Sequence, residues 1–144
     1  MERTENSVAE ALARAHVALL ADLRELEQAT GSSSGKRLAE LRVRLSTTRT
    51  HLAEHFRFEE QNGYMDAVQK REPRLERVIQ QLSEEHGELA QSLAVLIEQA
   101  KAVTSLDCPF REAVRRWIKR VREHEVRENE LVQDAFDLDI GAED

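Results

Sequence analysis

The chain has 144 residues, of which 34% are charged and 40% hydrophobic, with a net charge of −7, five glycines, two prolines and one cysteine. This length predicts a single domain with a substantial core, and the scarcity of turn residues predicts long amphipathic helices. The negative charge argues against nucleic acid or an anionic membrane as the main partner, because such binding depends on cationic groups.

The same composition indicates the compartment. No apolar run approaches the roughly 20 residues of a membrane span, and the first residues lack the apolar segment of a signal peptide. The lone Cys108 allows no intrachain disulfide, as is usual in a reducing environment. We therefore expect a cytoplasmic protein without a membrane partner.

Helical periodicity and capping signals predict four helices. Ser7 and Glu10 have the spacing of a capping box, and a Gly/Ser-rich turn at 31–35 ends the first helix. Pro73 fits the first turn of the third helix, and Asp107 can cap the fourth. The expected fold class is all-α, an up-down-up-down antiparallel four-helix bundle in a single domain over 1–144. Its helices are expected at residues 8–29, 36–71 with a kink near 63, 73–103 and 108–135, followed by an acidic tail at 136–144.

Polar residues interrupt the apolar stripe of each predicted helix. The stripes advance in steps of three and four, so these residues occupy positions that a packed helix normally gives to leucine. Two of the helices carry a His-x-x-x-Glu pair, whose side chains share one helix face. The interrupting residues are His16, His55, Glu59, His86, His124 and Glu128.

The four histidines are expected to lie at one height. Residues equally far from a connecting loop face each other in an antiparallel bundle, because each helical residue rises about 1.5 Å. The midpoints between successive histidines fall at residues 35.5, 70.5 and 105, beside the three predicted connections. The polar residues should therefore form one layer inside the bundle.

Such a layer predicts a metal site, because buried imidazoles and carboxylates are costly unless they are paired or bind a cation. The donors are too many for one tetrahedral zinc and too rich in nitrogen for calcium or magnesium. Two ions bridged by Glu59 and Glu128 would each receive two histidines. With a bridging oxo or hydroxo group, each ion has about five ligands and room for a small molecule, which is the arrangement of a non-haem di-iron centre.

These residues resemble the hemerythrin-like, or HHE cation-binding, domain family. The motifs that carry the resemblance span roughly residues 8–135 and are His16, His55-Phe-Arg-Phe-Glu59-Glu60, His86-Gly-Glu-Leu and His124-Glu-Val-Arg-Glu128. The resemblance implies a four-helix bundle with two irons that bind dioxygen or related small oxidants. Oxygen-carrying hemerythrins have His-x-x-x-His in the third helix and His-x-x-x-x-Asp in the fourth, whereas this chain has Ala90 and Glu128 at the corresponding points. It thus looks like relatives with a six-residue ligand set.

Several assignments stay open at this point. His51 or Glu60 could complete the metal coordination, or His51 could orient His55 or a bound water. Tyr64 could donate a hydrogen bond toward the metals. Glu125 is expected on a solvated face, where it pairs with a basic cluster on the fourth helix.

The leading hypothesis is a protein that binds or senses dioxygen, peroxide or nitric oxide, with its enzymatic activity left open and binding favoured over catalysis. One alternative is a peroxidase-like or nitric-oxide-reducing enzyme at the same metals. Another is iron storage or iron sensing, in which the instability of the metal-free bundle is the signal. The simplest alternative is a helical scaffold that binds no metal. The sequence does not predict the oligomeric state.

Overall fold

The computed structural model describes residues 2–31, 35–61 and 64–136, and these residues confirm the all-helical prediction. Four long helices of 27 to 29 residues account for most of them. Within the described ranges there is no β-strand. In chain order the elements are α1 (Glu2–Ala29), α2 (Gly35–Gln61), α3 (Tyr64–Arg71), the 3₁₀ turn η1 (Pro73–Leu75), α4 (Glu76–Ala102) and α5 (Cys108–Phe136).

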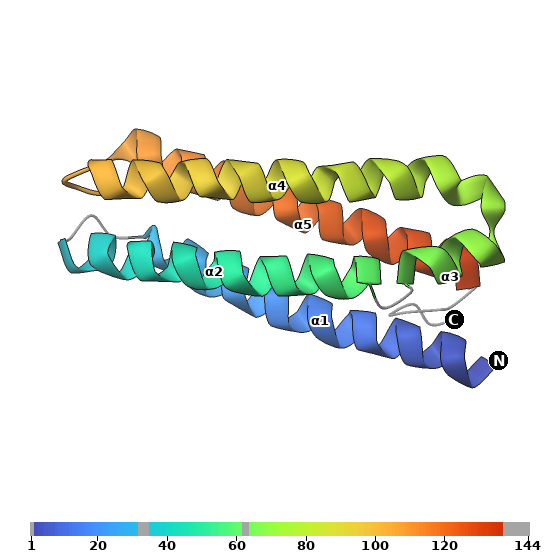
Figure 1. Ribbon diagram of the computed structural model, residues 1–144. Helices are drawn as coiled ribbons and strands as arrows, with labels where there is room; N and C mark the ends of the chain where they lie inside the picture. Colours follow the sequence, from blue (N-terminus) through green and yellow to red (C-terminus); the bar gives the residue numbers. More distant parts are fainter. Residues whose placement is uncertain (1, 32–34, 62–63, 137–144) are drawn as a thin grey trace.

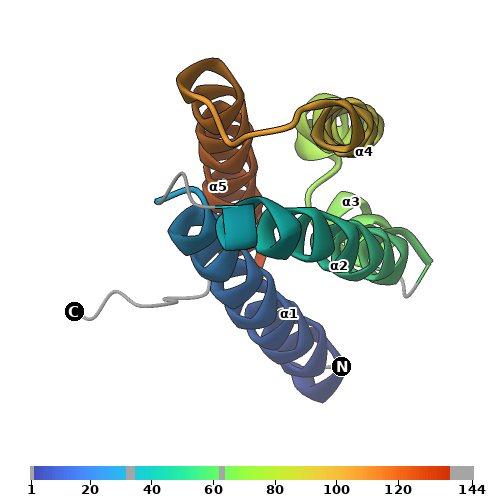
Figure 2. The same ribbon diagram turned by 90° about the vertical axis from the view of Figure 1, so that its left-hand side faces the viewer.

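The four long helices form a bundle around a common core. Each packs against two of the others, so that α1 contacts α2 and α5, and α4 contacts α2 and α5. Figure 1 shows the α1–α2 and α4–α5 connections at one end of the bundle, with α3 and η1 at the other. The end view in Figure 2 shows α4 and α5 on one side of the bundle, with α1 and α2 on the other. No helix among the described residues has the length and apolarity needed to cross a membrane.

The beginning of α1 differs from the prediction. This helix starts at Glu2 instead of residue 8, so Ser7 lies within the helix and does not cap it.

The single helix predicted over 36–71 is two helices, α2 and α3. The pair Asn62-Gly63, which has low helix propensity, stands between these two helices in the sequence. The bend expected near 63 falls on residues outside the described ones, as does the acidic tail from residue 137 onward.

The remaining boundaries follow the predicted signals. Pro73 opens a 3₁₀ turn that leads into α4, since a first turn does not need the amide hydrogen that proline lacks. Asp107 caps α5 as predicted, because its Oδ1 accepts a hydrogen bond of 3.0 Å from the Phe110 amide. The predicted helix over 108–135 and the observed one differ by a single residue.

The apolar core is divided into two clusters. The larger cluster lies toward the α1–α2 connection and includes Leu23, Leu45 and Leu93. The smaller one lies around α3 and η1 and includes Val68 and Leu75. Six buried apolar residues lie near the height of the predicted polar layer, four in the larger cluster and two in the smaller: Leu19, Leu52, Leu89 and Val121, then Leu82 and Leu131. The layer between these clusters is where the predicted polar residues should meet.

Candidate metal centre

The structure brings together the six polar residues singled out in the sequence. They come from all four long helices, and each is at most 6% exposed: His16 on α1, His55 and Glu59 on α2, His86 on α4, and His124 and Glu128 on α5. The expected common height is therefore observed. The layer has two halves, which are named after their histidine pairs, His16/His55 and His86/His124.

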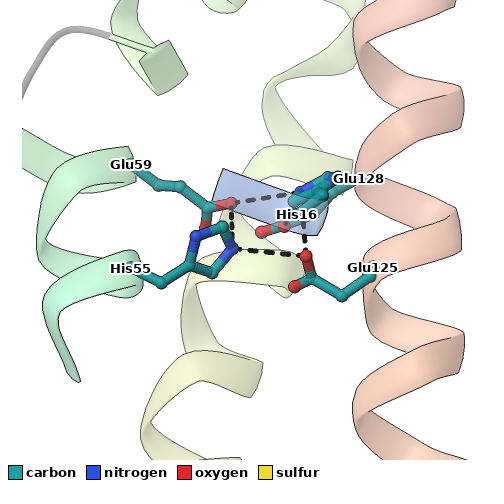
Figure 3. A group of neighbouring side chains, drawn as sticks. All are labelled: His16, His55, Glu59, Glu125 and Glu128. Atoms are coloured by element: carbon teal, nitrogen blue, oxygen red, sulfur yellow. Dashed lines mark ion pairs between the residues drawn. The ribbon is translucent and has the colours of Figure 1, made fainter. Parts of the chain in front are cut away.

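The His16/His55 half contains an additional carboxylate, Glu125. The Nε2 atoms of His16 and His55 lie 2.9 and 3.2 Å from Glu125 Oε1. Glu59 Oε2 completes this half at 3.0 Å from His55 Nε2. Figure 3 shows the side chains of α2 and α5 pointing toward one another, with His16 between them.

The His86/His124 half has fewer carboxylates. Glu128 Oε2 lies 3.0 Å from His86 Nε2 and 2.9 Å from His124 Nε2. Glu59 Oε1 lies 3.0 Å from His86 Nε2. The ring of Phe56 stacks on His86 with 3.9 Å between centroids, which gives this half an apolar wall.

Two carboxylates divide their oxygens between the halves. Glu59 directs Oε2 toward His55 and Oε1 toward His86. Glu128 directs Oε1 toward His16, at 3.4 Å, and Oε2 toward His86 and His124. A carboxylate placed between two donor sets in this way can bridge two cations, one bonded to each oxygen.

Glu125 corrects an expectation from the sequence. It was expected on the solvated face of α5, but it is 3% exposed and faces the histidines. The reason is that α5 packs against both α1 and α4, so its buried surface is wider than one stripe. Ile118 and Val132, seven residues before and after Glu125, are also buried and mark this second stripe.

The outer nitrogens of three histidines are held by acceptors. His86 Nδ1 donates to Glu60 Oε2 and His124 Nδ1 donates to Glu85 Oε1, both at 2.7 Å. His16 Nδ1 donates to Asn129 Oδ1 at 3.1 Å. This fixes the tautomer in which the lone pair of Nε2 is directed into the layer, as a metal-binding histidine requires.

The residues considered as extra ligands lie elsewhere. The Glu60 side chain is 45% exposed and serves as the acceptor for His86. His51 is also exposed, and its Nδ1 donates to Asp22 Oδ2 at 2.6 Å, so it belongs to neither histidine half. The side chain of Tyr64 lies outside the described residues.

The carboxylates favour protonated imidazoles in the metal-free layer. Burial lowers the pKa of these histidines, but the adjacent carboxylates outweigh burial. Glu125 contributes most to raising the pKa of His16 to about 11 and that of His55 to about 9. Glu128 contributes most to raising the pKa of His86 to about 10. Protons thus hold the positive charge that a cation would supply.

The donor atoms are arranged as ligands around a shared cation, and several of them form no hydrogen bond with one another. His16 Nε2, His55 Nε2 and both oxygens of Glu59 and Glu125 are buried without a hydrogen bond in the part of the chain that the structure describes. One donor atom from each of five residues lies within 4.8 Å of the others in the first group, and three do so in the second. Such spacing suits ligands about 2.0–2.2 Å from a shared ion. The groups are His16, His55, Glu59, Glu125 and Glu128, and His86, His124 and Glu128.

A helical bundle with a buried layer of imidazole and carboxylate donors defines a helical domain built to hold metal. The chain also matches the family model described as the hemerythrin HHE cation binding domain over residues 7–136. It therefore belongs to the hemerythrin HHE cation-binding domain family, as its motifs predicted. Searches of curated proteins and of solved structures found no match.

Proposed function

We propose that this protein is an up-down four-helix bundle that holds two iron ions and binds or senses dioxygen or a related small oxidant, such as peroxide or nitric oxide. The observation that carries the proposal is the division of the Glu59 and Glu128 oxygens between two histidine pairs. One ion in each half would then be bridged to the other by both carboxylates. Helical bundles with carboxylate bridges of this kind are suited to di-iron centres.

The donor chemistry favours iron. Imidazole nitrogen suits iron, zinc, copper and nickel, whereas carboxylate-rich oxygen sites suit magnesium, calcium and manganese. A buried mixture of four imidazoles and several carboxylates in a helical bundle fits iron best among these. An oxo or hydroxo group between the ions would add one more ligand to each.

The chain's own residues have three roles in this proposal. His16, His86 and His124 present Nε2 as neutral donors because their Nδ1 protons are held by outer acceptors. Glu59 and Glu128 set the separation of the two ions. The apolar residues on both sides of the layer exclude water from it. Iron bound there supplies Lewis-acid and one-electron redox chemistry toward a small oxidant.

Iron sensing or storage is the second candidate, and the buried donor atoms without hydrogen bonds favour it. In the metal-free bundle these buried atoms have ion pairs with one another in place of a bound cation. Metal that binds only the folded layer adds its binding free energy to the stability of the bundle, so the metal-free bundle is less stable than the loaded one. A cell could read that difference as a signal of iron supply.

The test begins with protein purified from iron-replete cells. We expect about two irons per chain and an absorption spectrum that changes with a reductant. Less than about one metal per chain, with stability unaffected by chelation, would refute the metal-binding proposal. A spectrum that forms with oxygen and reverts on its removal supports oxygen binding. Sustained peroxide consumption with an electron donor indicates the peroxidase-like alternative instead.

A further inference from the structure

The two halves of the layer offer unequal numbers of donors. The His16/His55 half has five donor residues, of which three are carboxylates: Glu59, Glu125 and Glu128. Glu59 and Glu128 also contact His86 in the other half, whereas Glu125 is grouped with the His16/His55 half alone. The His86/His124 half groups those two histidines with Glu128, and Glu59 Oε1 adds a contact to His86 at 3.0 Å. Because iron commonly takes up to about six ligands, the second half leaves more of its coordination to be filled from outside the chain.

The partners of the outer nitrogens are unequal as well. His86 and His124 donate to the carboxylates of Glu60 and Glu85, whereas His16 donates to the neutral amide of Asn129. His55 Nδ1 has no hydrogen-bond partner among the described residues. A carboxylate acceptor makes an imidazole more basic and a stronger electron donor to its metal than an amide does.

Arg127 positions one of these carboxylates. Its guanidinium forms two hydrogen bonds to Glu85, at 2.6 and 2.7 Å, which hold that carboxylate against His124 Nδ1. The His86/His124 half thus combines the fewest donor residues with the two imidazoles that donate to carboxylates.

We propose that an external small molecule binds at the His86/His124 metal position, and that Glu125 keeps the His16/His55 position closed to it. The inference rests on the proposed two-iron function. The expected ligands are diatomic molecules or small anions that bond directly to iron, because the ring of Phe56 stacks on His86 and packs edge-on against His124, so a large ligand would have to displace it.

Two surface grooves lie near the layer. A groove of about 220 Å³ between α4 and α5 is lined by Leu82 and Leu131, each one helical turn from a donor of the His86/His124 half. A groove of about 310 Å³ between α1 and α2 is lined by His55 itself. The closure of the His16/His55 position therefore rests on coordination by Glu125 and not on the absence of a groove.

The experiment adds nitric oxide to the reduced, iron-loaded protein and to two variants. In the unchanged protein we expect about one nitric oxide per chain. Glu125→Ala removes a donor from the closed position, so we expect about two per chain. Glu123→Ala is the matched control, because Glu123 is exposed on the same helix and should leave the ratio at about one. A ratio of about two in the unchanged protein would overturn the proposal.

A second pair of variants identifies which of the two irons binds nitric oxide. Neither variant changes a residue that we propose as a metal ligand. Glu85→Gln weakens the acceptor behind His124, and Asn129→Ala removes the one behind His16. With ⁵⁷Fe, we expect Glu85→Gln to shift the Mössbauer signal of the nitric-oxide-bound iron and Asn129→Ala to shift that of the other iron. The opposite pattern would overturn the proposal. Failure of the two-iron function itself would be visible beforehand, as fewer than two iron signals without nitric oxide.

Discussion

Replacement of Glu128 with alanine tests the centre of the proposed site most directly. This carboxylate is 0% exposed and lies 2.9, 3.0 and 3.4 Å from the Nε2 atoms of His124, His86 and His16. Its removal takes a donor from both halves, so the variant should lose at least one of the two metals. In the metal-free protein, three buried imidazoles lose a carboxylate that favours their protonated form.

The size of the stability loss follows from these contacts. Removing one partner of a buried charged pair costs about 3–5 kcal/mol, because the remaining group is left without compensation. His124 keeps Glu85 and His16 keeps Glu125, so the lower half of that range is expected. For a domain of this size, a loss of 3 kcal/mol lowers the melting temperature by roughly 10 °C.

Metal analysis and thermal unfolding, with and without a chelator, measure both effects. Glu130→Ala is the control, because Glu130 is exposed on the same helix two residues further on. The reasoning would be refuted by a Glu128→Ala protein that keeps about two irons per chain and melts within about 2 °C of the unchanged protein.

Three further predictions concern stability. Gly87→Ala should stabilise the metal-free protein by about 0.5–1 kcal/mol, because Gly87 is an exposed residue within α4 and a Cβ there meets no atom within 4 Å; a lower melting temperature would contradict this. The raised pKa values of His55, His86 and His16 (about 9, 10 and 11) mean that their stabilising contribution is complete below the ordinary value of 6.5 and is lost as pH rises toward those values. Urea unfolding of the metal-free protein should therefore show falling stability from about pH 7 to 10, and a rise would show that the sign is wrong. Chelation should lower the unfolding free energy by about 3 kcal/mol if free metal had been about 100-fold above its dissociation constant, as calorimetry would detect; an unchanged value would count against metal binding.

The position of the polar layer was predictable because the long helices are regular. Counting residues from each connection sufficed to place four histidines at one height, since helical rise is constant. The ring centroids of His16 and His55 are 5.3 Å apart, and those of His86 and His124 are 5.1 Å apart. The division of the predicted second helix into α2 and α3 did not disturb this, because His55 and Glu59 both lie on α2.

Glu125 was missed because a single stripe of apolar residues was assumed for each helix. On α5 the stripe that contains His124 and Glu128 has a neighbour that contains Ile118 and Val132. The apolar residues seven positions before and after Glu125 were the sequence signal that could have predicted its burial. A helix that packs against two others buries a broader surface than one stripe, and a carboxylate inside that surface cannot be solvated.

The acceptors behind the histidines could not be predicted from periodicity. Glu60, Glu85 and Asn129 each reach a histidine on another helix, across sequence separations of 26, 39 and 113 residues. Such contacts depend on the rotation and tilt of both helices, which a stripe of apolar residues defines only coarsely. The difference between the two halves was therefore visible only in the structure.

The placement of the layer between two apolar clusters of unequal size bears on how the metal-free protein behaves. Well-packed apolar side chains in place of the polar residues would often be as stable or more so, so the layer is better explained by metal binding than by folding. The larger cluster around Leu23, Leu45 and Leu93 can hold the long helices together without metal. The smaller cluster around Val68 and Leu75 has less apolar surface to bury, so the α3 end would depend more on the metal that we propose the layer binds. Removal of metal should therefore increase amide hydrogen exchange around α3 and η1 first. A uniform increase along the bundle would show that the α3 end does not depend on metal more than the other end does.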